Sequence, residues 1–126
     1  MKKYPHIGTR TEILREDLPC LNPVIGAGLA SSLVGIDHVN GMFFQNERDK
    51  LFLVVRVGTF TNGSVTLEIP VQTLVQSYSI APVEHELVLG IQIIGPFSRH
   101  YENTLGRVEV NFSGEVSAFI GLGRMP

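Results

Sequence analysis

Cysteine is nearly absent from this 126-residue chain and tryptophan is absent altogether, and each shortage excludes a class of protein. The single cysteine, Cys20, cannot form an internal disulfide or a thiolate zinc site, as is typical of a protein made in a reducing cytoplasm. We expect Cys20 to be packed or inert, because a nucleophilic thiol needs a base and an electropositive niche. Tyrosine occurs only three times, which disfavours a sugar-binding surface built from exposed aromatic rings.

Charge is also scarce, since charged residues make up 17% of the chain against a usual quarter or so. The 12 acidic and 10 basic side chains are scattered and form no basic stripe, so we expect no nucleic-acid partner. No apolar run approaches the roughly 20 residues of a membrane-spanning helix, so we expect no membrane insertion. A chain this short of charge either has a generous core or buries surface against another molecule, and the second option favours an oligomer.

The chain does contain a series of short segments, from about residue 39 to residue 122, in which every second residue is apolar. Such alternation is typical of a strand with one face in a core and one face in water. The predicted strands are 33–37, 42–45, 50–57, 64–69, 72–80, 84–94, 107–112 and 116–122, the last two paired across a turn at 113–115. Seven or eight strands without intervening helices predict an all-β fold, either an antiparallel β-sandwich or a jelly-roll-like barrel.

Residues 1–32 differ from the rest and are predicted to form an irregular N-terminal arm, with residues 33–126 as the β-sandwich domain. Prolines interrupt the arm, and its last part is rich in glycine, alanine and serine. We favour an arm that packs along its own domain or along a neighbour. The alternative is a short helix over residues 11–18, because Thr9-Arg10-Thr11-Glu12 fits a capping-box pattern.

Two of the predicted strands contain segments, residues 51–57 and 87–94, that are apolar on both faces, except for Arg56 in the first and nearly so in the second. A strand in a two-layer sandwich needs only one apolar face. The second face is therefore expected to be covered by the arm, by a neighbouring subunit or by long loops.

The histidines are the natural candidates for chemistry, but no two of them have the spacing of a metal-ligand pair, and we expect no metal or other cofactor. Asp37 and His38 could belong to a catalytic triad, yet no Gly-x-Ser-x-Gly elbow supplies the serine. In Glu84-His85-Glu86, alternation puts both glutamates on one strand face and His85 on the other, as at a solvated edge. Asp37, His38 and the three residues 84–86 are the only candidates for the active site of a small-barrel enzyme. We favour a non-enzymatic protein.

The longest polar loop of the β region, residues 97–105, is the best candidate for recognition. Two aromatic rings, a guanidinium, an imidazole and an amide are the side chains that binding loops use most. The same groups would also serve a contact between subunits, so both uses remain open. The candidate residues are Phe97, Arg99, His100, Tyr101 and Asn103.

Three segments carry a resemblance to a known family: Ser64-Val65-Thr66-Leu67-Glu68-Ile69-Pro70, Gln76-Ser77-Tyr78-Ser79-Ile80-Ala81-Pro82 and Met42-Phe43-Phe44-Gln45-Asn46. A strand ending in proline, a turn, an aromatic strand near another proline, and an upstream strand ending in asparagine together resemble small virion proteins of bacteriophages. The best-known members are the penton (vertex) proteins of tailless, membrane-containing phages. The resemblance covers about residues 39–94 and departs from the family pattern where residues 73–75 replace a frequent glycine. It implies a ring-forming structural subunit and carries no catalytic residues over.

The resulting hypothesis is a non-enzymatic assembly protein, a capsid, vertex or decoration subunit, that forms symmetric oligomers through its arm and apolar sheet faces. Its partners would be copies of itself and other virion proteins. It would be made in a host cytoplasm and reside in a virion, with a cytoplasmic location as the alternative. The alternative function is a monomeric ligand- or carbohydrate-binding module that uses the loop at residues 97–103.

Overall fold

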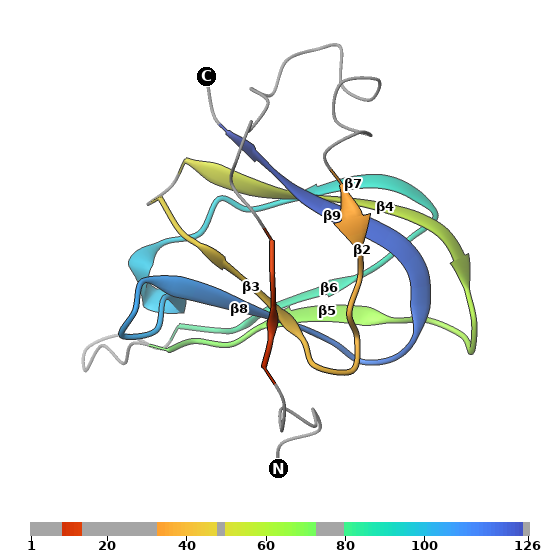
Figure 1. The fold of residues 1–126 in the computed structure, drawn as a ribbon, viewed down its shortest axis with the longest axis horizontal. Helices are drawn as coiled ribbons and strands as arrows, with labels where there is room; N and C mark the ends of the chain where they lie inside the picture. Colours follow the sequence, from red (N-terminus) through yellow and green to blue (C-terminus); the bar gives the residue numbers. More distant parts are fainter. Residues whose placement is uncertain (1–8, 14–32, 48–49, 73–79, 125–126) are drawn as a thin grey trace.

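The computed structural model describes residues 9–13, 33–47, 50–72 and 80–124 (Figure 1). Within these ranges the chain forms two β-sheets that pack face to face, and one short 3-10 helix, η1 (Arg99–Tyr101), lies in a loop. The predicted all-β sandwich is confirmed. The strands are β1 (Thr11–Glu12), β2 (Val34–Gly35), β3 (Met42–Gln45), β4 (Leu51–Phe60), β5 (Thr66–Ile69), β6 (Val83–Glu86), β7 (Gly90–Ile94), β8 (Arg107–Phe112) and β9 (Val116–Arg124).

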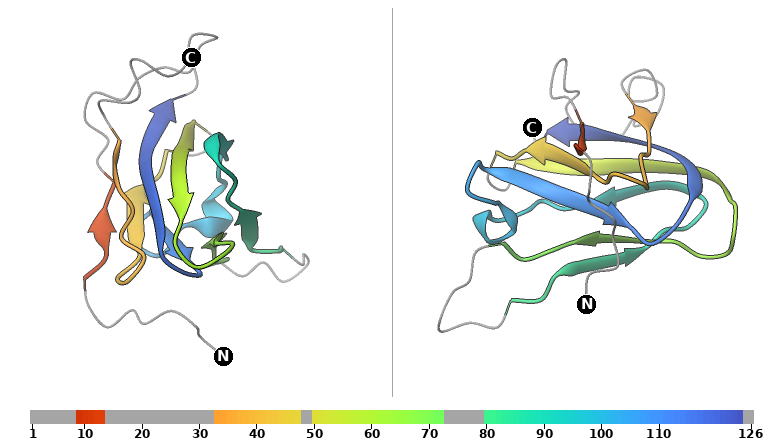
Figure 2. Two further views of the ribbon diagram at one scale, coloured as in Figure 1. Left: turned by 90° about the vertical axis from the view of Figure 1, so that its right-hand side faces the viewer. Right: turned by 60° about the horizontal axis from the view of Figure 1, so that its bottom comes forward.

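The two layers differ in width and in strand order (Figure 2). The five-stranded sheet has the order β1-β3-β8-β5-β6, and the four-stranded sheet has the order β2-β9-β4-β7. Strand β1 runs parallel to β3, and all the other pairs are antiparallel. The edge strands are therefore β1 and β6 in the five-stranded sheet and β2 and β7 in the four-stranded sheet.

The core lies between the sheets and consists of the inward half of each alternating run. Because successive side chains of a strand point to opposite faces, one apolar residue in two suffices to fill it. The strand residues of the core are Met42, Phe44, Leu51, Leu53, Val55, Val57, Leu67, Ile69, Ile94, Val108, Val110, Phe112, Val116, Ala118, Ile120 and Leu122. Ile13, Val65, Leu87 and Phe97 join them from the connecting segments.

The described part of the N-terminal segment extends the five-stranded sheet. Thr11 and Glu12 form β1, which pairs with Met42 and Phe43 of β3, and Ile13 is 1% exposed in the core. The alternative of a helix beginning at Thr11 is therefore wrong for these residues. Residues 14–32, which hold the rest of the predicted arm and Cys20, lie outside the described part of the chain.

The predicted strand 84–94 is two strands in different sheets. Strand β6 pairs with β5, whereas β7 pairs with β4. Gly90 has a φ of +96°, which a residue with a Cβ rarely adopts, and the chain changes sheet just before it. The buried Gln92 side chain holds this crossing, since it accepts from the Val88 amide at 2.8 Å and donates to the Gly90 carbonyl at 2.9 Å. The largely apolar run at residues 87–94 hid the crossing in the sequence.

The predicted pairing of strands 107–112 and 116–122 is also wrong. Strand β8 lies between β3 and β5, and β9 lies between β2 and β4 in the other sheet. The turn at 113–115 carries the chain across the core, so that Phe112 and Val116 are both buried within it. Alternation shows which face of a strand is buried, but both strands would bury the same residues in either arrangement.

The remaining strand predictions differ from the structure mainly at their ends. Strand β3 has the predicted bounds, and β4 continues three residues beyond the predicted end because its pairing with β9 resumes after a bulge between Val57 and Thr59. The predicted strand 33–37 is reduced to β2, and the predicted strand 64–69 begins at Thr66. Most of the predicted strand 72–80 lies outside the described residues.

Candidate functional site

The predicted recognition loop is anchored by its first aromatic ring. Phe97 is 2% exposed and packs in the core, with ring centroids 5.7 Å from Phe44 and 6.4 Å from Tyr101. The Tyr101 hydroxyl donates to the Ala81 carbonyl at 2.9 Å. Phe97 is therefore inaccessible to a ligand on the surface, and Tyr101 is partly used to hold the loop against the chain before β6.

The other loop candidates point to different surroundings. Arg99 and His100 lie in η1, which Ser98 caps by accepting from the His100 amide. Asn103 instead turns back toward β8, where its side-chain oxygen accepts from the amides of Leu105 and Arg107 at 2.9 and 3.1 Å. Asn103 also lines a pocket whose other lining residues come from outside the loop.

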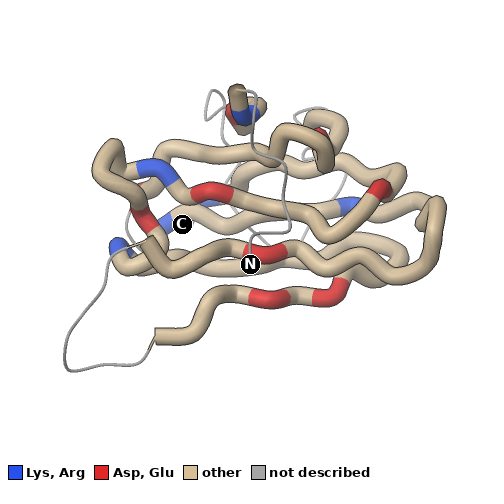
Figure 3. The backbone as a smooth tube through the Cα atoms, turned by 90° about the horizontal axis from the view of Figure 1, so that it is seen from below, with Lys and Arg blue, Asp and Glu red and all other residues tan. Residues whose placement is uncertain are grey.

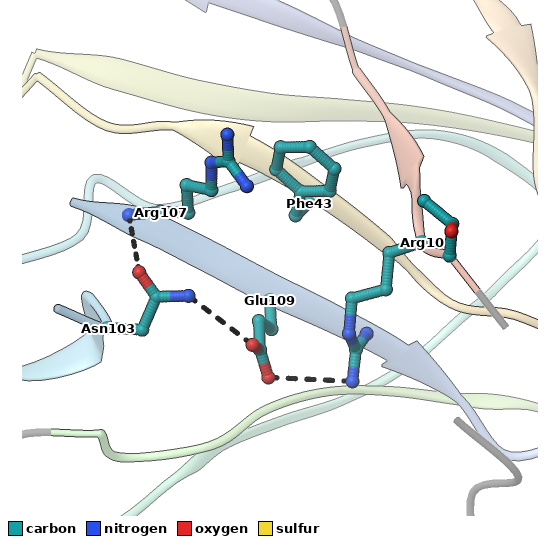
Figure 4. A pocket seen from close by; sticks show the side chains of 6 residues that line it. Arg10, Phe43, Asn103, Arg107 and Glu109 are labelled. Atoms are coloured by element: carbon teal, nitrogen blue, oxygen red, sulfur yellow. Dashed lines mark hydrogen bonds and ion pairs between the residues drawn. The ribbon is translucent and has the colours of Figure 1, made fainter. Parts of the chain in front are cut away.

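That pocket, on the outer face of the five-stranded sheet, is shown in Figure 4. It has a volume of about 170 Å³ and combines two guanidinium groups, one carboxylate, one amide and one aromatic ring. The lining residues are Thr9, Arg10, Phe43, Asn103, Arg107 and Glu109. Phe43 and Glu109 are cross-strand partners on β3 and β8, and Arg107 is the next residue on the same face of β8.

Glu109 is the acceptor at the centre of this polar group. Its carboxylate accepts from the Gln72 amide at 3.0 Å and from the Asn103 amide at 3.4 Å, and it forms a 3.5 Å ion pair with Arg10. Three donors from three separate segments therefore converge on one carboxylate. This arrangement fixes the Glu109 charge on a sheet face that also carries Arg10, Arg107 and Glu12.

Arg10 reaches across the sheet from the segment before β1. Its Nη1 donates to the Asn111 side chain at 2.8 Å and lies above Gly41, where no side chain obstructs it. Burial lowers the pKa of the Arg10 guanidinium, and the nearby Glu109 charge opposes that shift. The guanidinium stays charged at neutral pH because an arginine starts from a very high pKa.

Arg107 is bound differently from Arg10. Its guanidinium lies 4.6 Å from the centroid of the Phe43 ring, a cation–π contact. Within the described part of the chain the Arg107 guanidinium forms no hydrogen bond or ion pair. The pocket therefore presents one arginine that is held by a ring and whose donors remain available.

The outer face of the four-stranded sheet has the opposite character. On β4, β7 and β9 the described outward positions hold mainly apolar residues and glycines, with Thr59 paired to Ser117 at one end and a single charge, Arg56, which lies 5.5 Å from the Phe119 ring centroid. Ile91, Ile93 and Phe119 are 49%, 41% and 43% exposed there. The adjoining crossing between β6 and β7 adds the exposed Val88 and Leu89. We call these five exposed apolar residues the apolar face.

The residues considered for catalysis lie on two separate elements, Asp37 and His38 in the turn before β3 and the other three on β6. The Asp37 carboxylate accepts from Thr11 and Asn40 and so closes the turn before β3. On β6, Glu84 and Glu86 are exposed along the edge of the sheet (Figure 3), and His85 faces inward as the partner of Leu67. Among the described residues no three His, Cys, Asp or Glu side chains gather as a metal site, and no helix has the length and apolarity to cross a membrane.

Sequence reasoning missed Arg10, Phe43, Arg107 and Glu109. Their signal was present in part, because Arg107 and Glu109 occupy the polar alternation of a clear strand. The register that brings Phe43 opposite Glu109 is not encoded in alternation. No family model, curated protein or solved structure matches this chain, so its function is argued from these surfaces.

Proposed function

We propose that this protein is a non-enzymatic structural subunit that assembles with copies of itself through the apolar face. The observation that supports this proposal is the exposure of Ile91, Ile93 and Phe119 on the outer face of the four-stranded sheet, where Arg56 is the single charge among the described residues of β4, β7 and β9. Exposed apolar patches of this kind mark interaction surfaces on soluble proteins. Covering a half-exposed isoleucine or phenylalanine contributes about 1 kcal/mol, so several together stabilise an interface.

The edge of the same sheet supports a copy of the chain as the partner. Edge strands usually carry charges or proline that prevent pairing with another chain. Strand β6 follows this rule with Glu84 and Glu86, whereas β7 has no charged residue and no proline between Gly90 and Ile94. Pairing at β7 would extend the apolar face without a break from one copy to the next.

The finer assignment is a capsid, vertex or decoration subunit of a virion that closes into a symmetric ring. It is supported by the resemblance over residues 39–94 to small virion proteins of tailless phages. A two-fold dimer buries the same patch on both copies, whereas a larger ring joins two different patches of each copy, so the ring form is supported by the resemblance and not by the apolar face. Other virion proteins would be the further partners.

The decisive measurement is the absolute mass of the full chain by light scattering combined with native mass spectrometry. We expect a closed oligomer of defined size for the unaltered chain. An Ile91→Lys/Ile93→Lys variant is expected to be a folded monomer, because two charges would have to be buried in the contact. The matched control is Thr61→Lys/Ser64→Lys, which adds the same charge at two exposed positions and is expected to assemble normally.

A monomeric unaltered chain, or an Ile91→Lys/Ile93→Lys variant that still assembles, would overturn the proposal. The role of the arm is tested by removing residues 1–8 only, because removal of residues 1–32 would also delete β1 and the core residue Ile13. A monomer would favour the second candidate, a ligand-binding module, which is supported by the pocket beside Asn103.

A further inference from the structure

We propose that the pocket on the five-stranded sheet binds a small organic carboxylate through the guanidinium of Arg107. This inference is independent of the assembly proposed above, because the pocket and the apolar face lie on the outer sides of different sheets. It concerns a ligand that would be bound by each copy of the chain. The argument starts from the different bonding of the two arginines.

Arg10 already has its partners. One of its terminal nitrogens donates to the Asn111 oxygen at 2.8 Å, and the other forms the ion pair with Glu109. Glu109 in turn accepts from two amides as well. These groups form a satisfied network that defines one wall of the pocket and contributes little unused bonding capacity.

The guanidinium of Arg107 supplies the hydrogen-bond donors that a ligand could use. The Phe43 ring, 4.6 Å from the guanidinium carbon, supports one face of the planar group. The backbone amide of Arg107 is also held, since it donates to Asn103 at 3.1 Å. A guanidinium stacked in this way keeps its N–H edge available, and that edge matches the two oxygens of a carboxylate. The stacking also orients the group before a ligand arrives, which reduces the ordering that binding requires.

The charge of the pocket favours a single negative charge. Arg10 and Arg107 contribute two positive charges and Glu109 contributes one negative charge, which leaves a net charge of +1. A carboxylate neutralises this charge. A phosphate dianion would bring a second negative charge beside Glu109, so we expect phosphate to bind more weakly.

The size of the pocket admits more than a bare carboxylate group. Its volume of about 170 Å³ is similar to that of a cavity of about 150 Å³ known to admit benzene. The Phe43 ring and the aliphatic parts of the arginines provide apolar contact for a small carbon skeleton. Benzoate is therefore a suitable probe, with acetate as the probe that lacks the ring.

The test is an NMR titration of the isotope-labelled full chain with sodium benzoate at constant ionic strength. We expect saturable shifts of the Asn103 side-chain amide and of the Arg107 backbone amide, and weaker binding of acetate. Arg107→Gln is expected to weaken benzoate binding about tenfold or more, because it removes a charge-assisted pair of hydrogen bonds. Arg107→Lys should fall between the two, since it keeps the charge without the planar fork.

The matched control is Arg56→Gln, which removes an arginine that also lies over a phenylalanine ring but on the opposite sheet. We expect this variant to bind benzoate like the unaltered chain. Circular dichroism of each variant shows whether it is folded, and the milder Arg107→Lys change keeps the test readable if Arg107→Gln does not fold. Shifts that do not saturate, equal weakening by Arg56→Gln, or phosphate binding as tight as benzoate would each overturn the proposal.

The carboxylate could also come from an acidic side chain of a second copy. In that case benzoate would compete with the contact between copies, and the mass of the protein would fall as benzoate is added. A mass that stays constant during a saturable titration supports a free small molecule. A falling mass would overturn it.

Discussion

The Thr11 hydroxyl donates a 2.6 Å hydrogen bond to the Asp37 carboxylate and so joins β1 to the turn between β2 and β3. The same carboxylate accepts from the backbone and side-chain amides of Asn40 at 3.1 and 3.3 Å. The Thr11 bond, reinforced by the Asn40 bonds and opposed by a desolvation effect, lowers the pKa of Asp37 below its ordinary value of 3.8.

We expect Asp37→Asn to lower the free energy of unfolding by about 1 kcal/mol at neutral pH, the usual value for losing hydrogen bonds to a charged group near the surface. Because the folded pKa is the lower one, the stabilisation is fully present above the unfolded pKa near 3.8 and is lost as the pH falls through the folded pKa. Urea unfolding at neutral and acidic pH measures both effects. Glu84→Gln, at an exposed position on β6, is the control. A difference that persists undiminished in acid would contradict this account.

Two features disfavour a side chain at position 41, the backbone conformation and the nearby Arg10 side chain, and substitutions can separate their effects. Its φ is +77°, and a Cβ there would collide with the Arg10 guanidinium. Gly63 has a similar φ of +89° but open space around its Cβ position. We expect Gly63→Ala to cost about 1 kcal/mol from backbone strain alone. Gly41→Ala should cost about 1 kcal/mol more, because Arg10 must leave Asn111 and Glu109.

A double-mutant cycle checks this interpretation of Gly41. In an Arg10→Ala background the collision with the guanidinium is absent and only the 3.2 Å approach to the Asn111 oxygen is left, so the cost of Gly41→Ala should fall toward that of Gly63→Ala. The measurement is the free energy of unfolding of the four proteins in urea. Equal costs of Gly41→Ala with and without Arg10 would show that the backbone conformation alone explains the glycine.

The fold was largely predictable from alternation, whereas the pocket was not. The pattern of β8 identifies Val108 and Val110 as inward residues, and the structure buries both. The same pattern cannot identify the neighbouring strand, because pairing depends on contacts between distant segments. The pocket cannot be predicted without knowing which strands are neighbours, since Arg10 contacts Asn111 over a separation of 101 residues.

The loop at residues 97–103 illustrates the same limit at the level of one side chain. A phenylalanine in a polar loop is as compatible with an exposed recognition ring as with an anchor in the core. The structure distinguishes the two, because Phe97 lies against Phe44 between the sheets. Loop residues carry no periodicity that would have revealed this burial.

Phe97→Ala is therefore expected to act on stability. Removing a buried phenylalanine side chain costs about 3–5 kcal/mol, because apolar contacts are lost and a cavity remains. Tyr101→Phe, which removes a single hydroxyl bonded to the Ala81 carbonyl, should cost about 1 kcal/mol or less. Thermal and urea unfolding measure both variants. A fully stable Phe97→Ala variant would contradict the placement of this ring.

His85 provides the last prediction, since it faces inward on a strand whose two glutamates face water. Its ring is partly buried beside Leu67, and its Nε2 is a buried atom without a hydrogen-bond partner among the described residues. Such an atom costs about 1–3 kcal/mol, so His85→Leu should raise the free energy of unfolding by about 1 kcal/mol.

The control for His85→Leu is His100→Leu, because the His100 ring does have a partner, the Ser98 hydroxyl at 3.2 Å from Nδ1. We expect this second change to leave stability unchanged or to lower it. Urea unfolding of the two variants compares an imidazole without a partner to one that is bonded. If His85→Leu is instead destabilising, the imidazole makes a favourable contact that its position opposite Leu67 does not explain, and a role for His85 in binding would have to be tested directly.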